Sequence, residues 1–147
     1  MPKKRILVLC TGNSARSQMG EGLFRAEGGE ACDVFSAGTK PSSVRPEAIA
    51  VMKEIGIDIS GHRSKSVDEF SGLSFDYVVT VCDNARDHCP VFPAGTARIH
   101  WSFEDPAAVE GDEAERQAAF RRIRDRIHQR VKTFFRDQAD APRSSSL

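Results

Sequence analysis

The loop after the first apolar run constrains the fold of this chain more than any other stretch. Residues 6–9, Ile-Leu-Val-Leu, have the pattern of a buried β-strand. A helical pattern of apolar residues, with Met19, Leu23 and Phe24, begins soon afterwards. Residues 10–17 must therefore turn the chain from a strand into a helix, and such units build parallel sheets covered by helices.

The composition of this loop suits a tetrahedral oxyanion. Cys10 begins it and Arg16 closes it, with five residues between them. The first N–H groups of a helix have no partner within the helix and carry partial positive charge. Arg16 offers a planar fork to two oxygens, and the same field stabilises a thiolate nucleophile at Cys10. The predicted oxyanion-binding residues are Thr11, Gly12, Asn13, Ser14, Ala15, Arg16 and Ser17.

Three residues of the loop have further expected roles. Gly12 relieves the turn, Asn13 tolerates left-handed backbone geometry, and Ser17 can donate a hydrogen bond to the thiolate. The alternative interpretation is a buried structural cysteine beside a solvated Arg16. The complete motif after a β-strand favours the oxyanion site.

The rest of the chain alternates strands with helices, which predicts an α/β fold. We expect one domain over residues 1–138, with a four-stranded parallel sheet flanked by helices on both faces. The polar residues 139–147 are predicted to be a disordered tail. Strands are predicted at 6–9, 32–37, 75–81 and 96–100, helices at 15–28, 46–55 and 112–137, and one helical turn at 67–70.

The charge balance argues against a nucleic-acid or membrane protein. The 21 basic and 21 acidic residues cancel, and no apolar run is long enough to span a bilayer or form a signal peptide. Arginines between residues 116 and 136 permit a nucleic-acid surface, but the acidic stretch 104–115 favours a solvated helix face. We expect a cytoplasmic protein whose cysteines are reduced, and therefore catalytic or metal-binding.

A second candidate segment is bounded by Cys82 and Cys89, after the third predicted strand. Its residues Asp83, Asn84 and Asp87 favour turns and mobile structure, so Cys89 can approach Cys82 or swing away. We favour a redox relay with the loop cysteine over two inert core cysteines and over zinc, because the spacing matches no common closed zinc site. The available histidine ligands for zinc are His62, His88 and His100.

The third candidate is Asp105, which follows the fourth predicted strand. The pair Asp105-Pro106 by itself often marks only a turn. The carboxyl ends of parallel strands meet at one rim, so Asp105 is expected near Cys10 and Cys82. A carboxyl group there can protonate a leaving oxygen, and we predict Asp105 to be the general acid.

Taken together, these residues resemble the low-molecular-weight phosphatase fold, and more closely the thioredoxin-coupled arsenate reductases built on it. The resemblance covers about residues 4–136. The cysteine pair separates reductase from phosphatase, since the loop is common to both. The motifs that carry the resemblance are 10–17 with Gln18-Met19 and Glu21-Gly22, 36–38, 57–60, His62, Cys82 and Cys89, and Asp105-Pro106.

The resemblance implies that three thiols reduce arsenate and that the biological role is arsenic detoxification. The Cys10 thiolate attacks arsenate while Asp105 protonates the departing hydroxyl and Arg16 stabilises the developing charge. Cys82 then attacks Cys10, arsenite leaves, and Cys89 attacks Cys82. Thioredoxin reduces the resulting Cys82–Cys89 disulfide. Phosphate and sulfate are expected as weak competing oxyanions of a monomer that has no tightly bound cofactor.

One position departs from the family pattern. Some relatives bind potassium at positions matching Asn13, Glu21, Ser36 and an aspartate after His62, where this chain has Lys65. We expect no tight potassium site and no other metal, because a lysine repels the ion, although Asn13, Glu21 and Ser36 can still brace the loop. The alternative is that Lys65 points to solvent. Cys32 matches no relay position and is expected to be a small buried strand residue.

Two other functions remain open. A small-molecule or tyrosine phosphatase would use Cys82 and Cys89 only for protection against oxidation. A non-catalytic oxyanion sensor would bind arsenate or phosphate without consuming reductant. Phosphatases of this fold usually carry aromatic residues at the positions of Ala107 and Ala108. Their absence here argues against a tyrosine phosphatase and is compatible only with slow hydrolysis of small esters.

Overall fold

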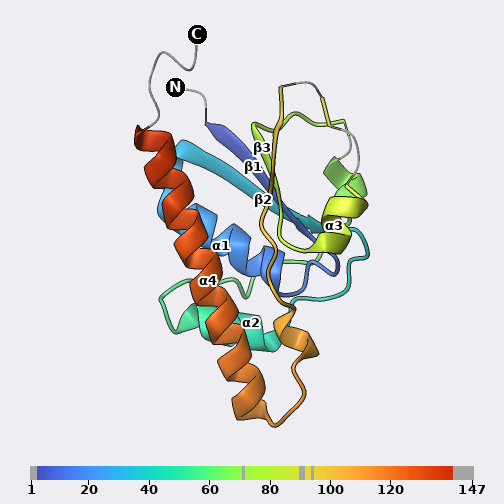
Figure 1. Ribbon diagram of the computed structural model, residues 1–147, viewed down its shortest axis with the longest axis vertical. Helices are drawn as coiled ribbons and strands as arrows, with labels where there is room; N and C mark the ends of the chain where they lie inside the picture. The colour runs from blue at the N-terminus through green and yellow to red at the C-terminus, as the bar shows by residue number, and fades with distance from the viewer. Residues whose placement is uncertain (1–2, 71, 90–91, 94, 141–147) are drawn as a thin grey trace.

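The structure is a computed structural model that describes residues 3–70, 72–89, 92–93 and 95–140. Within these residues, four strands and four helices follow one another as a βα alternation, with short single-turn helices between them (Figure 1). In chain order these are β1 (Lys4–Cys10), α1 (Arg16–Gly28), η1 (Gly29–Ala31), β2 (Cys32–Gly38), α2 (Pro46–Lys53), η2 (Val67–Phe70), β3 (Tyr77–Thr80), α3 (Asp83–Asp87), β4 (Ala97–His100), η3 (Pro106–Ala108) and α4 (Glu113–Asp140).

The strands form one parallel sheet in the order β2-β1-β3-β4, which confirms the predicted four-stranded parallel sheet. In its register Cys10 pairs with Gly38 at the carboxyl ends of β1 and β2, and Thr80 pairs with His100 at the carboxyl ends of β3 and β4. The carboxyl ends therefore meet at one rim. At the opposite end Cys32 pairs with Lys4, so Cys32 lies far from that rim.

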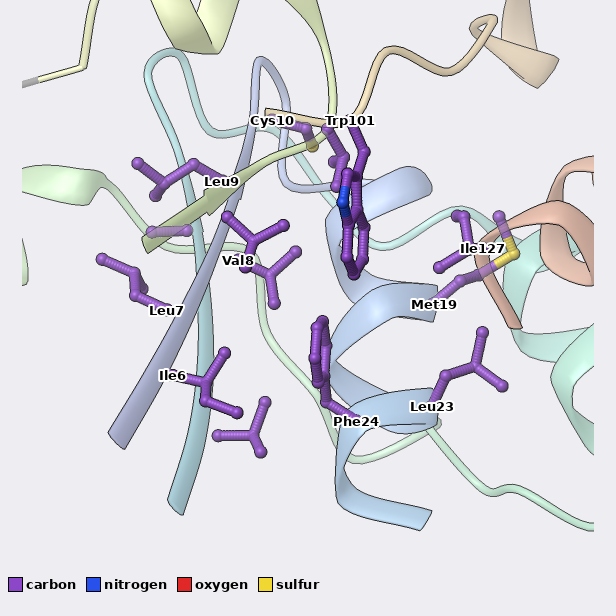
Figure 2. Packing of buried hydrophobic residues seen from close by; sticks show 14 of the residues in the cluster. Ile6, Leu7, Val8, Leu9, Cys10, Met19, Leu23, Phe24, Trp101 and Ile127 are labelled. Atoms are coloured by element: carbon purple, nitrogen blue, oxygen red, sulfur yellow. The ribbon is translucent and has the colours of Figure 1, made fainter. Parts of the chain in front are cut away.

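One face of the sheet packs against α1, which is itself covered by α4 (Figures 1 and 2). Val8, Met19, Leu23 and Phe24 are fully buried there, and Phe24 stacks on Trp101 with centroids 5.7 Å apart. The predicted apolar face of the last helix is confirmed, because all five of its members are buried. They are Phe120, Ile123, Ile127, Val131 and Phe134.

Successive side chains of a strand point to opposite faces, so Phe35 lies on the other face from Ser36. Phe35, Phe70, Phe75 and Phe92 form a chain of ring contacts with centroids 5.7 to 5.9 Å apart. Phe70 comes from η2. This second face is thus covered by a short helical turn and aromatic side chains rather than by a long helix.

Several element boundaries differ from the predictions by one to three residues. β3 is shorter than predicted, because its pairing with β1 runs only from Tyr77 to Thr80 and leaves Phe75 and Val81 outside the strand. α2 ends at Lys53, shortly before Gly56 with its positive φ of 79°. α4 continues to Asp140, because no glycine or proline interrupts it before Pro142.

The structure describes only part of the predicted tail. Residues 139 and 140 belong to α4, and residues 141–147 lie outside the described residues. The domain boundary at residue 138 therefore stays a prediction. Among the residues that the structure describes, no helix is both long and apolar enough to cross a membrane.

Candidate active site

The loop 10–17 connects β1 directly to α1, as the sequence predicts. Cys10 is the last residue of β1, and Arg16 is the first residue of α1. Asn13 adopts a φ of 48°, the left-handed geometry expected of it. Gly38 lies directly beneath the loop, where an added Cβ would collide with Thr11 O and lie 2.8 Å from Asn13 N.

The segment 39–45 holds the loop from outside. Its backbone N–H groups donate to the carbonyl oxygens of Thr11 at 2.8 Å, Gly12 at 3.0 Å and Ser14 at 2.8 Å. Ser64 Oγ donates a further hydrogen bond to Gly12 O at 2.8 Å. Because these carbonyl groups are used on the outer side, the loop keeps N–H groups for a ligand on its inner side.

A cavity of about 320 Å³ opens inside the loop. It brings together Cys10, Arg16 and Asp105, the three residues predicted to act on the oxyanion. Asn13 and Ser17 do not line it, because both are fully buried behind the loop. The lining residues are Cys10, Thr11, Gly12, Ser14, Ala15, Arg16, Ser42, Ser43, Arg45, Asp105 and Ala107.

Ser42, Ser43 and Arg45 are the lining residues that the sequence analysis missed. The signal was present in the topology, because residues 39–45 follow the carboxyl end of β2 at the same rim. Arg45 also comes directly before Pro46, the first residue of α2. It adds a second arginine to the cavity beside Arg16.

Cys10 is 2% exposed, and its Sγ lies 2.9 Å from Ser17 Oγ. Burial raises the pKa of the Cys10 thiol, while the hydrogen bonds from Ser17 and the charge of Arg16 oppose the rise. The sequence predicted a low-pKa thiolate. That prediction is wrong in direction, because desolvation of the sulfur outweighs its polar contacts.

The orientation of Ser17 follows from its neighbour. Asn13 Nδ2 donates to Ser17 Oγ at 2.7 Å and to Ser36 Oγ at 3.0 Å. Each serine oxygen accepts from the amide, so each hydroxyl proton is left to donate elsewhere. Ser36 donates to Glu21 Oε1 at 2.5 Å, and Ser17 donates to Cys10 Sγ. One amide thus turns Ser17 into a donor to the nucleophile.

Arg16 and Asp105 meet at the cavity edge. Arg16 Nη1 donates to Phe103 O at 3.0 Å, and its Nη2 lies 3.9 Å from Asp105 Oδ2. Asp105 Oδ1 also accepts from Ala107 N at 3.0 Å and so begins η3. Asp105 therefore caps a turn and also lines the cavity, and its role as the general acid stays a prediction.

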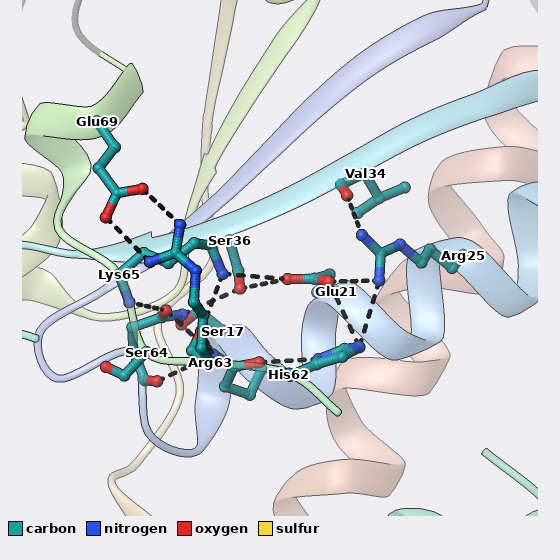
Figure 3. A network of polar contacts seen from close by, with 12 residues as sticks. Ser17, Glu21, Arg25, Val34, Ser36, His62, Arg63, Ser64, Lys65 and Glu69 are labelled. Carbon is teal, nitrogen blue, oxygen red and sulfur yellow. Dashed lines mark hydrogen bonds and ion pairs between the residues drawn. The ribbon is translucent and has the colours of Figure 1, made fainter. Parts of the chain in front are cut away.

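A buried polar network lies behind the loop (Figure 3). Glu21, 3% exposed, is its centre, and three basic side chains surround it. Arg25 pairs with its Oε2, His62 Nε2 lies 3.5 Å from Oε2, and Lys65 Nζ lies 3.9 Å from Oε1. The Glu21 carboxylate is thus compensated from several sides.

Lys65 belongs to this network. Its side chain is 13% exposed, its Nζ donates to Arg63 O at 3.0 Å, and its backbone N donates to Asn13 Oδ1 at 2.9 Å. The alternative of a solvent-directed lysine is therefore wrong. Burial lowers the pKa of Lys65, while Glu21 opposes that shift. Within the described part of the chain, no three His, Cys, Asp or Glu side chains are grouped to hold a metal ion.

Gln18 was named in the sequence only as part of a motif, yet it connects the loop to residue 62. Its Nε2 donates to Asn13 Oδ1 at 3.0 Å and to Arg63 O at 3.0 Å. Its Oε1 lies 2.9 Å from His62 Nδ1. Desolvation lowers the pKa of His62, which favours the neutral ring in this buried position. Both side chains therefore position the loop.

Cys82 lies beside the oxyanion loop, whereas Cys89 does not. Cys82 is 4% exposed, and its Sγ lies 3.3 Å from Thr11 Oγ1, one residue after Cys10. The same Sγ accepts from Ala85 N at 3.4 Å and caps α3. Cys89 lies beyond α3, is half-buried, and lines a separate cavity of about 100 Å³. All four cysteines, Cys32 included, carry thiols.

Comparisons with known proteins agree with this geometry. The sequence model of the family described as low molecular weight phosphotyrosine protein phosphatase matches residues 5–143. An arsenate reductase of Halalkalibacterium halodurans is 50% identical over 134 residues, which cover 91% of this chain and 96% of that protein. An arsenate reductase of Bacillus subtilis is 46% identical over the same shares of the two chains.

Solved structures give the same picture. An arsenate reductase in its phosphate-binding state has a TM-score of 0.73 at 32% identity, covering 89% of this chain and 95% of that one. The thioredoxin-dependent arsenate reductase of Corynebacterium glutamicum has a TM-score of 0.72 at 25% identity, covering 96% and 64%. A low molecular weight protein tyrosine phosphatase from T. tengcongensis has a TM-score of 0.77 at 25% identity, covering 92% and 99%.

Proposed function

This chain belongs to the low molecular weight phosphotyrosine protein phosphatase family, and on that premise we propose that it is an arsenate reductase. One observation carries the proposal. A second buried cysteine, Cys82, lies at the oxyanion loop, with its Sγ 3.3 Å from Thr11 Oγ1. Hydrolysis of a phosphate ester needs no second thiol there, whereas reduction of an oxyanion does. The names of the relatives supply arsenate as the substrate.

The first step takes place in the cavity inside the loop. The Cys10 thiolate attacks arsenic, and a hydroxyl leaves as water after taking a proton from Asp105. Arg16 exchanges its hydrogen bond with Phe103 O for the oxyanion and turns its fork to two of the oxygens. Ser17 donates to Cys10 Sγ and steadies the thiolate before attack. The loop N–H groups stabilise the charge that develops on oxygen.

The second and third steps are thiol exchanges. The Cys82 thiolate attacks Cys10 Sγ, and the electron pair of the sulfur–arsenic bond reduces arsenate to arsenite. The Cys89 thiolate then attacks Cys82 Sγ, a Cys82–Cys89 disulfide forms, and Cys10 leaves as a thiolate. Thioredoxin supplies two electrons and two protons to that disulfide, which restores the starting thiols.

The third step requires α3 to open. Cys89 lies seven positions after Cys82, and a helix rises about 1.5 Å per residue, so a helical path holds the two cysteines roughly 10 Å apart. A disulfide needs Cα atoms within about 7 Å. Forming the disulfide therefore requires one helical turn to unwind. This breaks the hydrogen bonds from Arg86 N to Cys82 O at 3.2 Å and from His88 N to Asn84 O at 3.0 Å. Cys89 is therefore the thiol that travels.

We also propose that Lys65 takes the place of a potassium ion. Its ammonium lies 3.9 Å from Glu21 Oε1 and competes for the carboxylate that such an ion would need. Phosphate and sulfate are proposed as weak competitors of arsenate, because they share its tetrahedral shape. Slow hydrolysis of small aryl phosphates is expected too, since the described lining residues of the cavity include alanine and serine but no aromatic side chain.

A coupled assay tests the proposed function. NADPH oxidation is followed with thioredoxin and thioredoxin reductase, with and without arsenate. We expect arsenate-dependent oxidation that disappears separately in Cys10→Ser, Cys82→Ser and Cys89→Ser. Cys32→Ser is the matched control and keeps the activity, because Cys32 lies at the opposite end of the sheet. Phosphatase turnover without any arsenate-dependent oxidation would overturn the proposal.

A further inference from the structure

Asp83, in the first turn of α3, accepts one hydrogen bond from the end of β4 and one from the segment that follows it. Its Oδ1 lies 3.0 Å from Nε2 of His100, the last residue of β4, and accepts a second hydrogen bond from Ser102 Oγ at 3.2 Å. A helix of five residues gains little from its own hydrogen bonds, because forming the first turn is unfavourable. Contacts made by its side chains therefore decide whether α3 stays folded.

His100 is well placed to hold Asp83, because its other ring nitrogen is anchored. His100 Nδ1 lies 2.7 Å from Oγ1 of Thr80, a buried residue of β3. When the Thr80 hydroxyl donates to Nδ1, the ring proton is on Nε2 and points to Asp83. When His100 is protonated, Nδ1 donates to Thr80 and the hydroxyl can donate to Ile99 O, 3.4 Å away. The contact with Asp83 is available in both states.

The electrostatics agree with this geometry. The hydrogen bond from His100 is the main cause that holds the pKa of Asp83 below its usual range, and Ser102 and Arg86 act in the same direction. Asp83 is therefore ionised near neutral pH, and a hydrogen bond to an ionised acceptor is stronger than one between neutral groups. The His100 side chain is 24% exposed, so water only partly competes for it.

We propose that the Asp83–His100 pair is a latch that keeps α3 closed and limits the rate at which Cys89 reaches Cys82. The inference rests on the relay proposed above. Asp83 follows Cys82 directly, and His100 lines the same cavity of about 100 Å³ as Cys89. The latch thus holds the first residue of the segment that must rearrange before the second disulfide can form.

Asp83 and His100 are positioning residues, since neither takes part in the bond changes. In the step that they control, the Cys89 thiolate attacks Cys82 Sγ, the Cys10–Cys82 bond breaks, and Cys10 keeps the electron pair. The latch keeps Cys89 away until Cys82 has reacted with Cys10. It also keeps the Cys82 sulfur capping α3, beside Thr11.

Opening the latch by mutation leaves α3 attached at a second point. Asn84 Oδ1 accepts hydrogen bonds from Thr39 Oγ1 at 2.9 Å and Thr11 Oγ1 at 3.3 Å. The Asp83 side chain is 63% exposed, so its removal creates no cavity in the core. Asp83→Ala is therefore expected to fold, and His100→Ala tests the same contact from the other side.

Hydrogen–deuterium exchange of the reduced protein, without arsenate, tests the latch itself. In Asp83→Ala and His100→Ala we expect the amides of residues 86–88 to exchange about threefold to tenfold faster, the effect of losing one ordinary hydrogen bond at a solvent-exposed carboxylate. The double variant should exchange no faster than the faster single variant, because both remove one contact. Asp87→Ala is the control, since Asp87 lies on the same helix and pairs with its neighbour Arg86 at 3.2 Å. Equal exchange in the latch variants and the control would overturn the latch.

Rapid quenching after mixing with arsenate, followed by disulfide mapping, tests its role in the relay. We expect the Cys82–Cys89 disulfide to form about threefold to tenfold faster in Asp83→Ala than in Asp87→Ala. Hydrolysis of a small aryl phosphate, which needs neither Cys82 nor Cys89, should be unchanged. Faster exchange with unchanged disulfide formation would contradict the proposed role. If the unmodified protein forms no disulfide with arsenate, the reductase proposal itself fails, whereas the exchange experiment still decides the latch.

Discussion

The chemistry of Cys10 depends on how its neighbours compensate for the burial of its sulfur. Burial raises its pKa, and Ser17 is the strongest opposing contact. Asn13 donates to Ser17 Oγ at 2.7 Å, which directs the Ser17 hydroxyl proton to Cys10. The thiolate is therefore stabilised by a chain of oriented side chains and not by one contact alone.

Ser17→Ala should make Cys10 less reactive at neutral pH. The variant loses a hydrogen bond that lowers the pKa of Cys10, so that pKa rises further. Because the thiolate reacts, alkylation by iodoacetamide at a fixed pH below this pKa should slow by about tenfold, and the rate–pH curve should move to higher pH.

Ser60→Ala is the matched control for this experiment, because Ser60 is exposed and hydrogen-bonds Asp58. The rate of Cys10 labelling is read by mass spectrometry of the peptide that contains it. A rate–pH curve for Ser17→Ala that lies on that of the control would show that Ser17 does not stabilise the thiolate.

The substitution Lys65→Asp should make the thermal stability of the protein depend on potassium. The substitution removes an ammonium 3.9 Å from Glu21 and adds a carboxylate beside it, which leaves two buried charges for a cation to bind. We expect the Tm of the variant to rise in potassium chloride relative to tetramethylammonium chloride at equal ionic strength. The unsubstituted protein should show the same Tm in both salts, and a potassium effect of equal size in both proteins would contradict the proposed replacement.

At the scale of elements, the end of β2 supports the loop that carries the chemistry. Gly38 pairs with Cys10 and lies so close to the loop that a Cβ would collide with Thr11 O. The neighbouring segment 39–45 then holds the loop carbonyl groups from outside. The shape of the loop is therefore set by β2 as well as by the two elements that it connects.

Gly38→Ala should slow catalysis at the Cys10 loop by a larger factor than any loss of folding stability would explain. The loop must shift by several tenths of an ångström to admit the methyl group, and a misplacement near 1 Å can cost about 10²-fold in rate. Hydrolysis of a small aryl phosphate measures the effect. Gly61→Ala is the control, because nothing lies within 4 Å of its Cβ position. Equal activities of the two variants would mean that Gly38 does not shape the loop.

The helix α3 shows where local sequence is insufficient. Asp83, Asn84 and Asp87 favour turns, and the sequence therefore predicted mobile structure between the cysteines. The structure forms a helical turn because Cys82 Sγ caps it and because Asp83 and Asn84 find partners on other elements. Those partners, His100 and Thr39, are distant in sequence, so no local pattern could reveal them.

For the whole molecule, the topology could be predicted because each buried strand is a short apolar run followed by a helical pattern. Parallel strands place their carboxyl ends together, so the sequence alone was enough to assign Cys10, Cys82 and Asp105 to one rim of the sheet. The sequence could not show that the Lys65 side chain points to the buried network or that Arg45 lines the cavity, since both depend on loop conformations. The pKa direction of Cys10 was missed because burial of the sulfur is a property of the folded molecule.

The central claim is that Cys82 attacks the sulfur of Cys10 after arsenate has bound. The most direct measurement is disulfide mapping of the Cys89→Ser variant, mixed with arsenate in the absence of thioredoxin and digested under acid quench. The account predicts one Cys10–Cys82 disulfide and one arsenite per protein, and none in the Cys82→Ser control. Arsenite release without that disulfide, or with a bridge to Cys32, would contradict the account.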